Sequence, residues 1–358
     1  MSLNEILRTY INSSHFLTYK RAEEISKEAD EPSFISSFIE NHRVLQDMLN
    51  DAQLDRHFII DAIYTHQSPK VKPSDCEKSV EIADLLIINV HHNTPNIPPM
   101  GNAMLFQAKR NLHARTGSLA HDTEAIQFYL YNKWPTFKFS TRKNEFEASV
   151  TQWDFSKTDS REHSKYILIY KGQAFNNKEL SLTSEFSRSG FYNSCAWNTA
   201  KCEDEERSAT DGLFCNEDFS ITLSSIINTS AGRFFNTGNN SPNDHWSLFI
   251  HAMLSLAVNK SYCYNLSRQN RVNCPRGVKV YNSFSRNILS LAFQHEVMNC
   301  ISGMHNEFRI TNSLLHSLSG DTPPPHSDGE YEFELPPSHP SIMIINSFNK
   351  ENYLLNHY

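Results

Sequence analysis

The sequence predicts an α/β fold with a mixed central sheet flanked by helices, followed by a mostly helical C-terminal part. Short runs of β-branched and aromatic residues, typical of strands, cluster between residues 58 and 110. Apolar residues at three- and four-residue spacing, typical of helices, lie on both sides of that region. With 39 % hydrophobic residues and only 11 glycines and 15 prolines in 358 residues, the composition is that of a folded protein.

The elements of the N-terminal half can be assigned in order. The first 50 residues are expected to be helical, because apolar residues recur at three- and four-residue spacing after Pro32-Ser33, a plausible helix start. A proline-rich loop at 91–102 separates two of the three strands that we expect next, because proline and glycine interrupt regular structure. The predicted strands are 58–65, 82–90 and 103–110, and a helix at 123–133 and a strand at 165–171 follow them.

Changes in composition divide the chain into three expected segments. Residues 1–175 form the α/β domain, and residues 176–242 are a polar connecting region with few periodic signals. Residues 243–358 form a helical C-terminal region, with predicted helices at 244–259 and 284–301 and an acidic, proline-rich tail from Asp321.

Charge and motif content exclude several classes of protein. The net charge of −7 shows no overall basic excess, and the longest apolar runs fall far short of the ~20 residues that cross a bilayer. We therefore expect no membrane partner, and with no secretory leader the expected location is the cytoplasm. Seven cysteines without a CxxC pair predict reduced thiols rather than disulfides or a structural zinc site. No nucleotide-binding glycine motif and no GxSxG motif is present, which argues against ATP-driven or serine-triad chemistry.

The most informative residues lie on two neighbouring predicted strands. Asp84, with Glu81 just before it, opens one strand, and Gln107 and Lys109 share one face of the next because side chains alternate along a strand. If the two strands pair antiparallel with Val90 near Ala103, Asp84 lies opposite Lys109. The alternative is that Gln-Ala-Lys is a chance tripeptide and that Asp84 only caps a turn.

These residue types suit hydrolysis of a phosphodiester. The Asp84 carboxylate, the Gln107 amide and the Ala108 backbone oxygen could hold Mg²⁺ or Mn²⁺, since hard cations prefer oxygen ligands. Lys109 could orient the attacking water and offset the developing negative charge. We therefore take Asp84, Gln107, Lys109 and Glu81 as candidate catalytic residues.

Asp84 and the Gln107-Ala-Lys109 tripeptide resemble the PD-(D/E)xK nuclease superfamily. The Gln-x-Lys form is similar to a branch found in type IV, methylation-dependent restriction endonucleases, and the resemblance covers roughly residues 33–171. It implies a restriction-endonuclease-like core, a Mg²⁺-dependent endonuclease acting on DNA in bacterial anti-phage defence, and often a homodimer. It also implies an upstream acid, for which Glu40 and Glu81 are both candidates.

Local charge also favours a phosphate-bearing partner. Residues 105–144 hold seven Lys or Arg against two acids, a local charge of +5, and within this segment Arg110, Lys138, Arg142 and Lys143 are candidate nucleic-acid-binding residues. Residues 261–300 form a second basic zone with interleaved tyrosines. A solvated loop is the competing interpretation of both segments.

Two functions therefore remain open from the sequence. The first is a metal-dependent DNA endonuclease, with DNA or RNA as the substrate still undecided. The second is a catalytically inactive, nuclease-like scaffold or sensor subunit that acts with partner proteins in a larger defence complex. Cleavage of plasmid DNA in the presence of a divalent metal would distinguish them.

Overall fold

The computed structural model describes fourteen stretches of the chain. They are residues 2–24, 28–52, 55–64, 69–93, 99–113, 115–119, 122–140, 150, 152–155, 162–171, 195–200, 209–238, 244–258 and 340–350. The helices are α1 (Leu3–Glu24), α2 (Glu31–Glu40), α3 (His42–Asp51), α4 (Asp122–Lys133), α5 (Phe219–Ile227) and α6 (His245–Val258), with a 3₁₀ turn at Ala209–Asp211.

Strands account for most of the remaining described residues. They are β1 (Arg56–Ile63), β2 (Lys70–Pro73), β3 (Val80–Glu81), β4 (Leu85–His92), β5 (Met100–Asn111), β6 (Thr116–Gly117), β7 (Phe137–Phe139), β8 (Ser164–Tyr170), β9 (Trp197–Ala200), β10 (Leu213–Phe214), β11 (Glu217–Asp218), β12 (Arg233–Phe235) and β13 (Ser341–Asn349).

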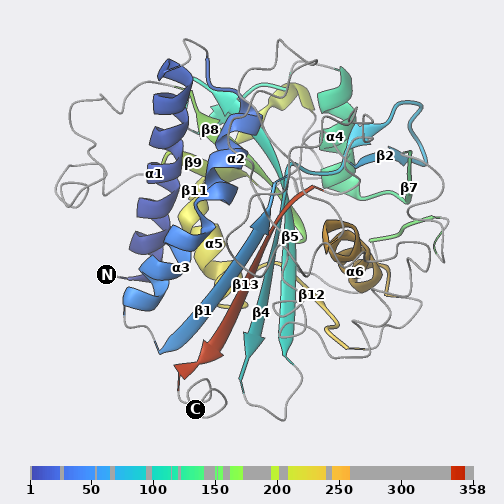
Figure 1. Cartoon of the computed structure of the whole chain (residues 1–358). Coiled ribbons are helices and arrows are strands. Elements are labelled where there is room, and N and C mark those ends of the chain that lie inside the picture. Colours follow the sequence, from blue (N-terminus) through green and yellow to red (C-terminus); the bar gives the residue numbers. More distant parts are fainter. Residues whose placement is uncertain are drawn as a thin grey trace, which may run out of the picture.

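The molecule is α/β, with one mixed sheet at its centre (Figure 1). The strand order is β1-β13-β4-β5-β8-β9-β11, and β12 pairs with the first residues of β5. The pairs β13–β4 and β5–β8 are parallel, and the other pairs along this path are antiparallel. The central strands are buried over almost their whole length, which explains their continuous apolar sequences.

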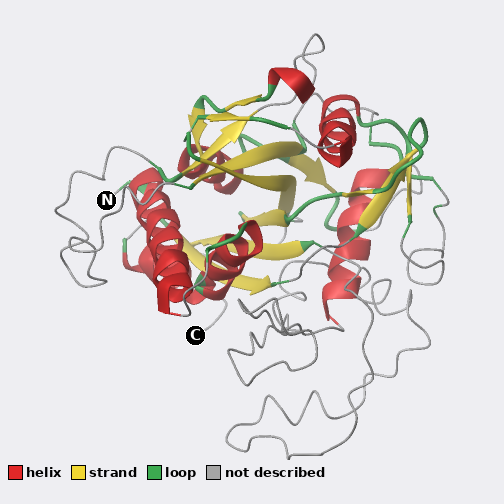
Figure 2. Cartoon of the chain, turned by 90° about the horizontal axis from the view of Figure 1, so that it is seen from above, coloured by secondary structure: helices red, strands yellow, loops and turns green. Residues whose placement is uncertain are grey.

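Helices cover both faces of this sheet (Figure 2). Helices α1, α2, α3 and α5 pack on one face, which we call the α1 side, and there Leu85, Ile87 and Phe106 belong to one apolar core. Helix α6 and the apolar residues of α4 pack on the other face, the α4 side, where Leu86 and Ile88 belong to a second core. Alternate residues of one strand therefore serve two different cores.

A second, smaller sheet lies on the α4 side and has the strand order β3-β2-β7. It is joined to the central sheet by the short connection between Glu81 at the end of β3 and Leu85 at the start of β4. Residues around the candidate site thus belong to two sheets that meet near Asp84.

The expected N-terminal elements are present, with shifted ends. The single helix expected up to residue 50 is three helices, and α2 begins where the Asp30 side chain accepts a hydrogen bond from the Ser33 amide at 3.0 Å. The expected strand at 82–90 is the two-residue β3 and the longer β4, because Asp84 interrupts it. The predicted helix at 244–259 is α6, whereas the one at 284–301 and the acidic tail lie outside the described residues.

Strand β13 was not expected from the sequence. Residues 341–349 lie between β1 and β4, as an interior strand next to the edge strand β1, although they are far from both in the sequence. All three expected segments of the chain therefore contribute strands to one sheet, since β9, β11 and β12 come from the polar region at 176–242.

None of the helices in the described part of the chain is long and apolar enough to span a lipid bilayer.

Candidate functional site

The candidate site forms where β4 begins beside β5. Leu85 pairs with Phe106, so Asp84 is the next residue outward and lies opposite Gln107. The Asp84 amide donates to the Phe106 carbonyl at 2.9 Å, and the Asp84 Oδ2 atom accepts from the Ala108 amide at 2.7 Å and from the Gln107 side-chain nitrogen. Asp84 and Gln107 are therefore in direct contact.

The expected register of these strands was wrong by two residues. Val90 pairs with Gly101 rather than with Ala103, so Asp84 lies opposite Gln107 and not opposite Lys109. A shift of two preserves the face on which each side chain lies, because side chains alternate with a period of two. The three polar residues still share the α4 side of the sheet.

Helix α4 holds Gln107 and Lys109 in place. Gln127 of α4 donates from Nε2 to the Gln107 Oε1 atom at 2.7 Å and to the Glu81 carbonyl at 3.1 Å. One helical turn earlier, Glu124 Oε1 lies 3.1 Å from Lys109 Nζ, and both side chains are mostly buried. The sequence analysis missed Glu124 and Gln127, although their three-residue spacing puts them on one face of the predicted helix.

A second acid, Glu31, lies at the same edge of β5 and was also missed. Strand β4 begins at Leu85, so beyond Phe106 the amides on this edge of β5 need other partners. Asp84 accepts from the Ala108 amide, and Glu31 Oε1 accepts from the next one on that side, the Arg110 amide, at 3.0 Å. The two donating amides are two residues apart, about 7 Å along the strand.

The backbone oxygen of Ala108 lies between these two carboxylates. Within a strand, the N–H and C=O of one residue point to the same side. The Ala108 carbonyl therefore faces the edge where Asp84 accepts from the Ala108 amide and Glu31 from the Arg110 amide. Three oxygen-bearing groups that could bind a cation, the Asp84 and Glu31 carboxylates and the Ala108 carbonyl, therefore lie along one short stretch of the edge of β5.

The electrostatics of the site show crowded negative charge. Burial, and then the nearby Glu31 carboxylate, raise the pKa of Asp84 to about 7, against the opposing effects of the Ala108 hydrogen bond and Lys109. Burial, and then repulsion from Asp84, raise the pKa of Glu81 well above its usual range. A bound cation would relieve both costs.

Lys109 keeps its charge in this environment. Burial lowers the pKa of its ammonium group, but the Glu31 and Asp84 carboxylates raise it by more. With the added hydrogen bond to Glu124, the pKa of Lys109 ends above its ordinary value. A permanent positive charge therefore lies close to the carboxylates.

The two upstream acids named from the sequence have different positions. Glu81, on β3, is close enough to Asp84 for the two carboxylates to raise each other's proton affinity. Glu40 lies at the far end of α2 from Glu31, about 13 Å away along the helix axis. The acid that α2 brings to the edge of β5 is Glu31, which is in the first turn of that helix.

The donor set fits a magnesium site with few protein ligands. Among the described residues no group of three or more His, Cys, Asp or Glu side chains is arranged to hold a metal ion. Mg²⁺ is commonly held by only one or two carboxylates and keeps several waters. Asp84 and the Ala108 carbonyl could hold it in that way, but the Gln107 oxygen accepts from Gln127 and would have to turn toward the ion.

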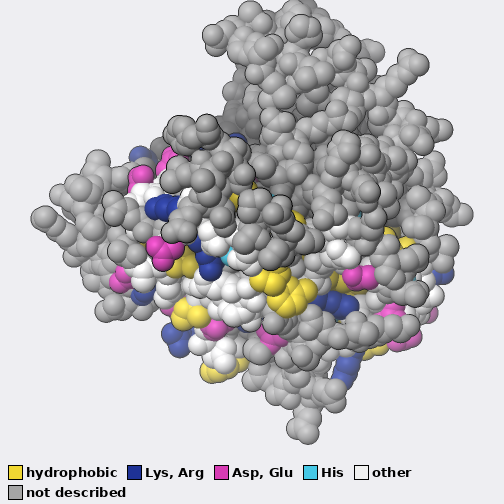
Figure 3. All heavy atoms as spheres, turned by 90° about the horizontal axis from the view of Figure 1, so that it is seen from below, with side chains coloured by type: hydrophobic (Ala, Val, Ile, Leu, Met, Phe, Trp, Pro, Cys, Tyr) yellow, Lys and Arg dark blue, Asp and Glu magenta, His cyan; other side chains and the backbone are white. Residues whose placement is uncertain are grey.

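The candidate nucleic-acid-binding residues are at separate places. The side chain of Arg110 points to the α1 side, where its Nη1 atom lies 3.5 Å from Glu28 Oε1. Lys138 is exposed on β7, and Arg142, Lys143 and the basic zone at 261–300 lie outside the described residues. On the face drawn in Figure 3, basic and acidic side chains are interspersed among the described atoms.

Comparisons of the chain with protein-family models, with curated proteins and with solved structures give no match. Inferences about function therefore depend on the residues described above and on the resemblance of the Asp84, Gln107 and Lys109 pattern to that of the PD-(D/E)xK nucleases.

Proposed function

We propose that this protein is a metal-dependent DNA endonuclease whose active site is centred on Asp84, Ala108 and Lys109. The observation that carries the proposal is the edge of β5, where Asp84 and Glu31 accept from amides on either side of the Ala108 carbonyl. Lys109 lies between those two amides in the sequence and keeps its positive charge. Oxygen atoms that could bind a metal ion and the positive charge of Lys109 thus lie together, as hydrolysis of a phosphodiester would require.

Each residue has a distinct task in this proposal. Asp84 and the Ala108 carbonyl would hold Mg²⁺ or Mn²⁺, which when bound would supply Lewis-acid chemistry, lowering the pKa of a water and polarising the phosphate. Lys109 orients that water and offsets negative charge as the phosphate is attacked. Glu124 positions the Lys109 ammonium, and Gln127 positions the Gln107 amide.

DNA as the substrate, anti-phage defence as the setting and a homodimer as the assembly are proposed from the resemblance alone. The Gln-x-Lys form that motivates them is similar to that of methylation-dependent restriction endonucleases.

A specific observation favours a second candidate, an inactive nuclease-like scaffold or sensor that works with partner proteins. Gln107 donates to Asp84 and accepts from Gln127, so in this structure both ends of its amide make contacts within the protein. A site that has lost its activity and kept only a structural role would show the same hydrogen bonds between its own side chains.

The experiment compares plasmid cleavage by Lys109→Met and Arg110→Met in Mg²⁺ and in a chelator. Both variants remove one positive charge from neighbouring residues of β5, but only Lys109 faces Asp84. We expect Lys109→Met to cut at least ~100-fold more slowly, the usual scale for losing a group that stabilises the transition state, with Arg110→Met close to wild type. Cleavage that continues in the chelator, or that is equal in all three proteins, would reject the active site; no cleavage by wild type would favour the scaffold.

A further inference from the structure

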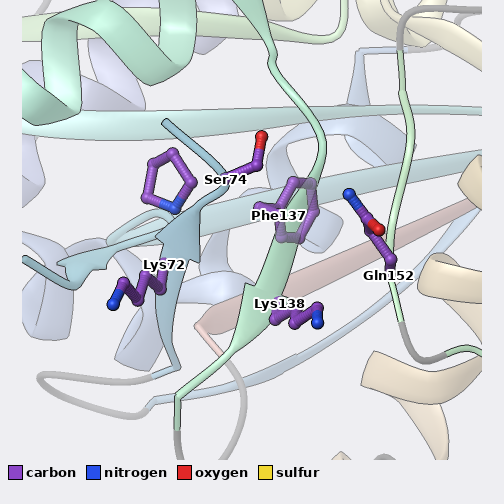
Figure 4. Close-up of a pocket in the computed structure, with 6 residues that line it drawn as sticks. Lys72, Ser74, Phe137, Lys138 and Gln152 are labelled. Atoms are coloured by element: carbon purple, nitrogen blue, oxygen red, sulfur yellow. The ribbon is translucent and has the colours of Figure 1, made fainter. Parts of the chain in front are cut away.

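The small β3-β2-β7 sheet carries an open pocket of about 310 Å³. Figure 4 shows its two lysines on neighbouring strands, with Gln152 on the segment beyond β7. The residues that line this lysine pocket are Lys72, Pro73, Ser74, Phe137, Lys138 and Gln152.

The two lysines are directly opposed across the strands. Lys72 of β2 pairs with Lys138 of β7 in antiparallel register, and both side chains are exposed. Like charges at opposed positions of a sheet repel and cost stability. No acid occurs among the described residues lining the pocket, so a bound anion would offset the positive charge of these two lysines.

Polar groups at the pocket are ordered by a chain of hydrogen bonds. Gln152 Nε2 donates to the Thr136 hydroxyl at 2.6 Å, and that hydroxyl donates to Ser74 Oγ at 3.0 Å. The Ser74 amide is also held, since it donates to the Thr136 carbonyl at 2.8 Å. Because Ser74 Oγ accepts in this chain, its own proton can be given to a ligand oxygen.

The pocket is linked to the candidate active site through β2. Lys70 pairs with Glu81, which lies three residues before Asp84. Lys72 is two residues further along the same strand, about 7 Å, and points to the same outer face as Lys70. The exposed lysines thus form a short row that leads away from Glu81.

We propose that the lysine pocket binds one backbone phosphate of a nucleic-acid strand, a few nucleotides from the bond that is cut. Lys72 and Lys138 supply the charge and Ser74 a hydroxyl donor, so the contact reads the backbone and not the base sequence. This inference rests on the proposed function, because it needs the strand to pass Asp84.

The test measures duplex binding at low salt, with Ca²⁺ in place of Mg²⁺ to limit cleavage, for a Lys72→Gln/Lys138→Gln double variant. The matched control, Lys20→Gln/Arg43→Gln, removes the same charge from exposed positions on α1 and α3, on the other side of the sheet. We expect at least ~10-fold weaker binding for the pocket variant only. Its salt dependence should fall by about one unit of slope, because one phosphate contact is lost.

Further measurements separate a phosphate contact from a change in folding. A Lys72→Arg/Lys138→Arg variant keeps both charges and should bind like wild type. A single neutral methylphosphonate, moved along the strand, should weaken wild-type binding at one position and leave the Gln double variant unaffected at that position. Melting temperatures of all variants should stay close together, since both lysines are exposed.

The outcomes distinguish a failure of the pocket inference from a failure of the proposed active site. If the pocket variant and the α1/α3 control bind equally well, or if wild type binds no nucleic acid at low salt, the pocket inference is wrong. If the pocket variant binds weakly as expected but Lys109→Met cuts as fast as wild type, the pocket stands and the proposed active site fails.

Discussion

Asp84 and Glu31 occupy positions that a neighbouring strand would otherwise fill. Each carboxylate accepts from a backbone amide of β5 beyond the point where β4 begins. An amide at a buried strand edge needs an acceptor, and a carboxylate is a strong one. The same short stretch therefore satisfies the backbone and concentrates negative charge, and burial together with that charge raises the pKa values of Asp84 and Glu81.

Gln107 allows a test of metal binding at the level of one residue. Gln107→Glu adds a carboxylate of similar size beside Asp84, so half-saturation of cleavage should occur at Mg²⁺ concentrations on the order of tenfold lower. Without metal, the added charge lies next to Asp84 with no cation to offset it, so the melting temperature should fall and should recover when Mg²⁺ is added. Gln107→Ala should need more Mg²⁺ than wild type or fail to cut.

Mg²⁺ titrations of cleavage and of thermal stability on the three proteins give the comparison. The same metal dependence in wild type, Gln107→Glu and Gln107→Ala would remove Gln107 from the site. It would also remove the main reason for relating the site to the Gln-x-Lys branch.

Several residues of the site could be predicted from the sequence, and one could not. Strand alternation is a strict rule, so Gln107 and Lys109 were correctly placed on one face. Glu31 was missed because its contact depends on how α2 approaches β5, which no local pattern encodes. The available signal was the helix start at Asp30 to Ser33, which places an acid in the first turn.

At the scale of elements, strand type could be predicted but register could not. The apolar run at 85–90 is long enough to identify a buried strand, yet the pairing with β5 depends on the conformation of the intervening loop. Val90 with Ala103 was a reasonable guess that was wrong by two residues. An error of one residue would have moved Asp84 to the α1 side and separated it from Lys109.

The packing of α1 on the sheet predicts a dependence of stability on pH. His15 of α1 is fully buried, stacks on Phe34 with ring centroids 4.9 Å apart, and accepts at Nδ1 from the Trp197 indole at 3.2 Å. Burial lowers the pKa of His15 to about 3. The folded state therefore favours the neutral ring, a contribution present above pH ~6.5 and lost as the pH falls toward 3.

Urea unfolding at pH 7 and pH 5 measures this effect in wild type and in His15→Gln, which keeps an acceptor for Trp197. Proton linkage with these pKa values gives a loss of about 2 kcal/mol for wild type between the two pH values from this one residue. The variant should be less stable at pH 7 but lose about 2 kcal/mol less on acidification. An equal loss in both proteins would show that His15 is not the group responsible.

For the whole molecule, the position of β13 between β1 and β4 makes the fold depend on contacts between distant parts of the sequence. Its neighbours β1 and β4 end about 280 and 250 residues earlier in the chain, as the registers of both pairs show. Sequence patterns act over windows of ten to twenty residues, so they can identify an apolar run such as Ser341–Asn349 but cannot place it in a sheet. Parallel pairing with β4 also requires a long crossover connection, which the intervening residues supply.

An interior strand that is buried on both faces of the sheet should be sensitive to substitution on both, and two adjacent residues of β13 test this. Met343 belongs to the core on the α1 side and Ile344 to the core on the α4 side, and both are fully buried. Met343→Ala and Ile344→Ala should each lower the free energy of unfolding by about 2–5 kcal/mol, the usual range for such truncations in a packed core. Val44→Ala on α3, where the side chain is 53 % exposed, is the control and should change it by less than ~0.5 kcal/mol. Because a strand with one exposed face buries only alternate side chains, a large loss at one of the two residues with little change at the other would show that β13 is not covered on both faces. Large and similar losses would show that β13 completes both cores, so that residues far apart in the sequence stabilise the two layers of helices together.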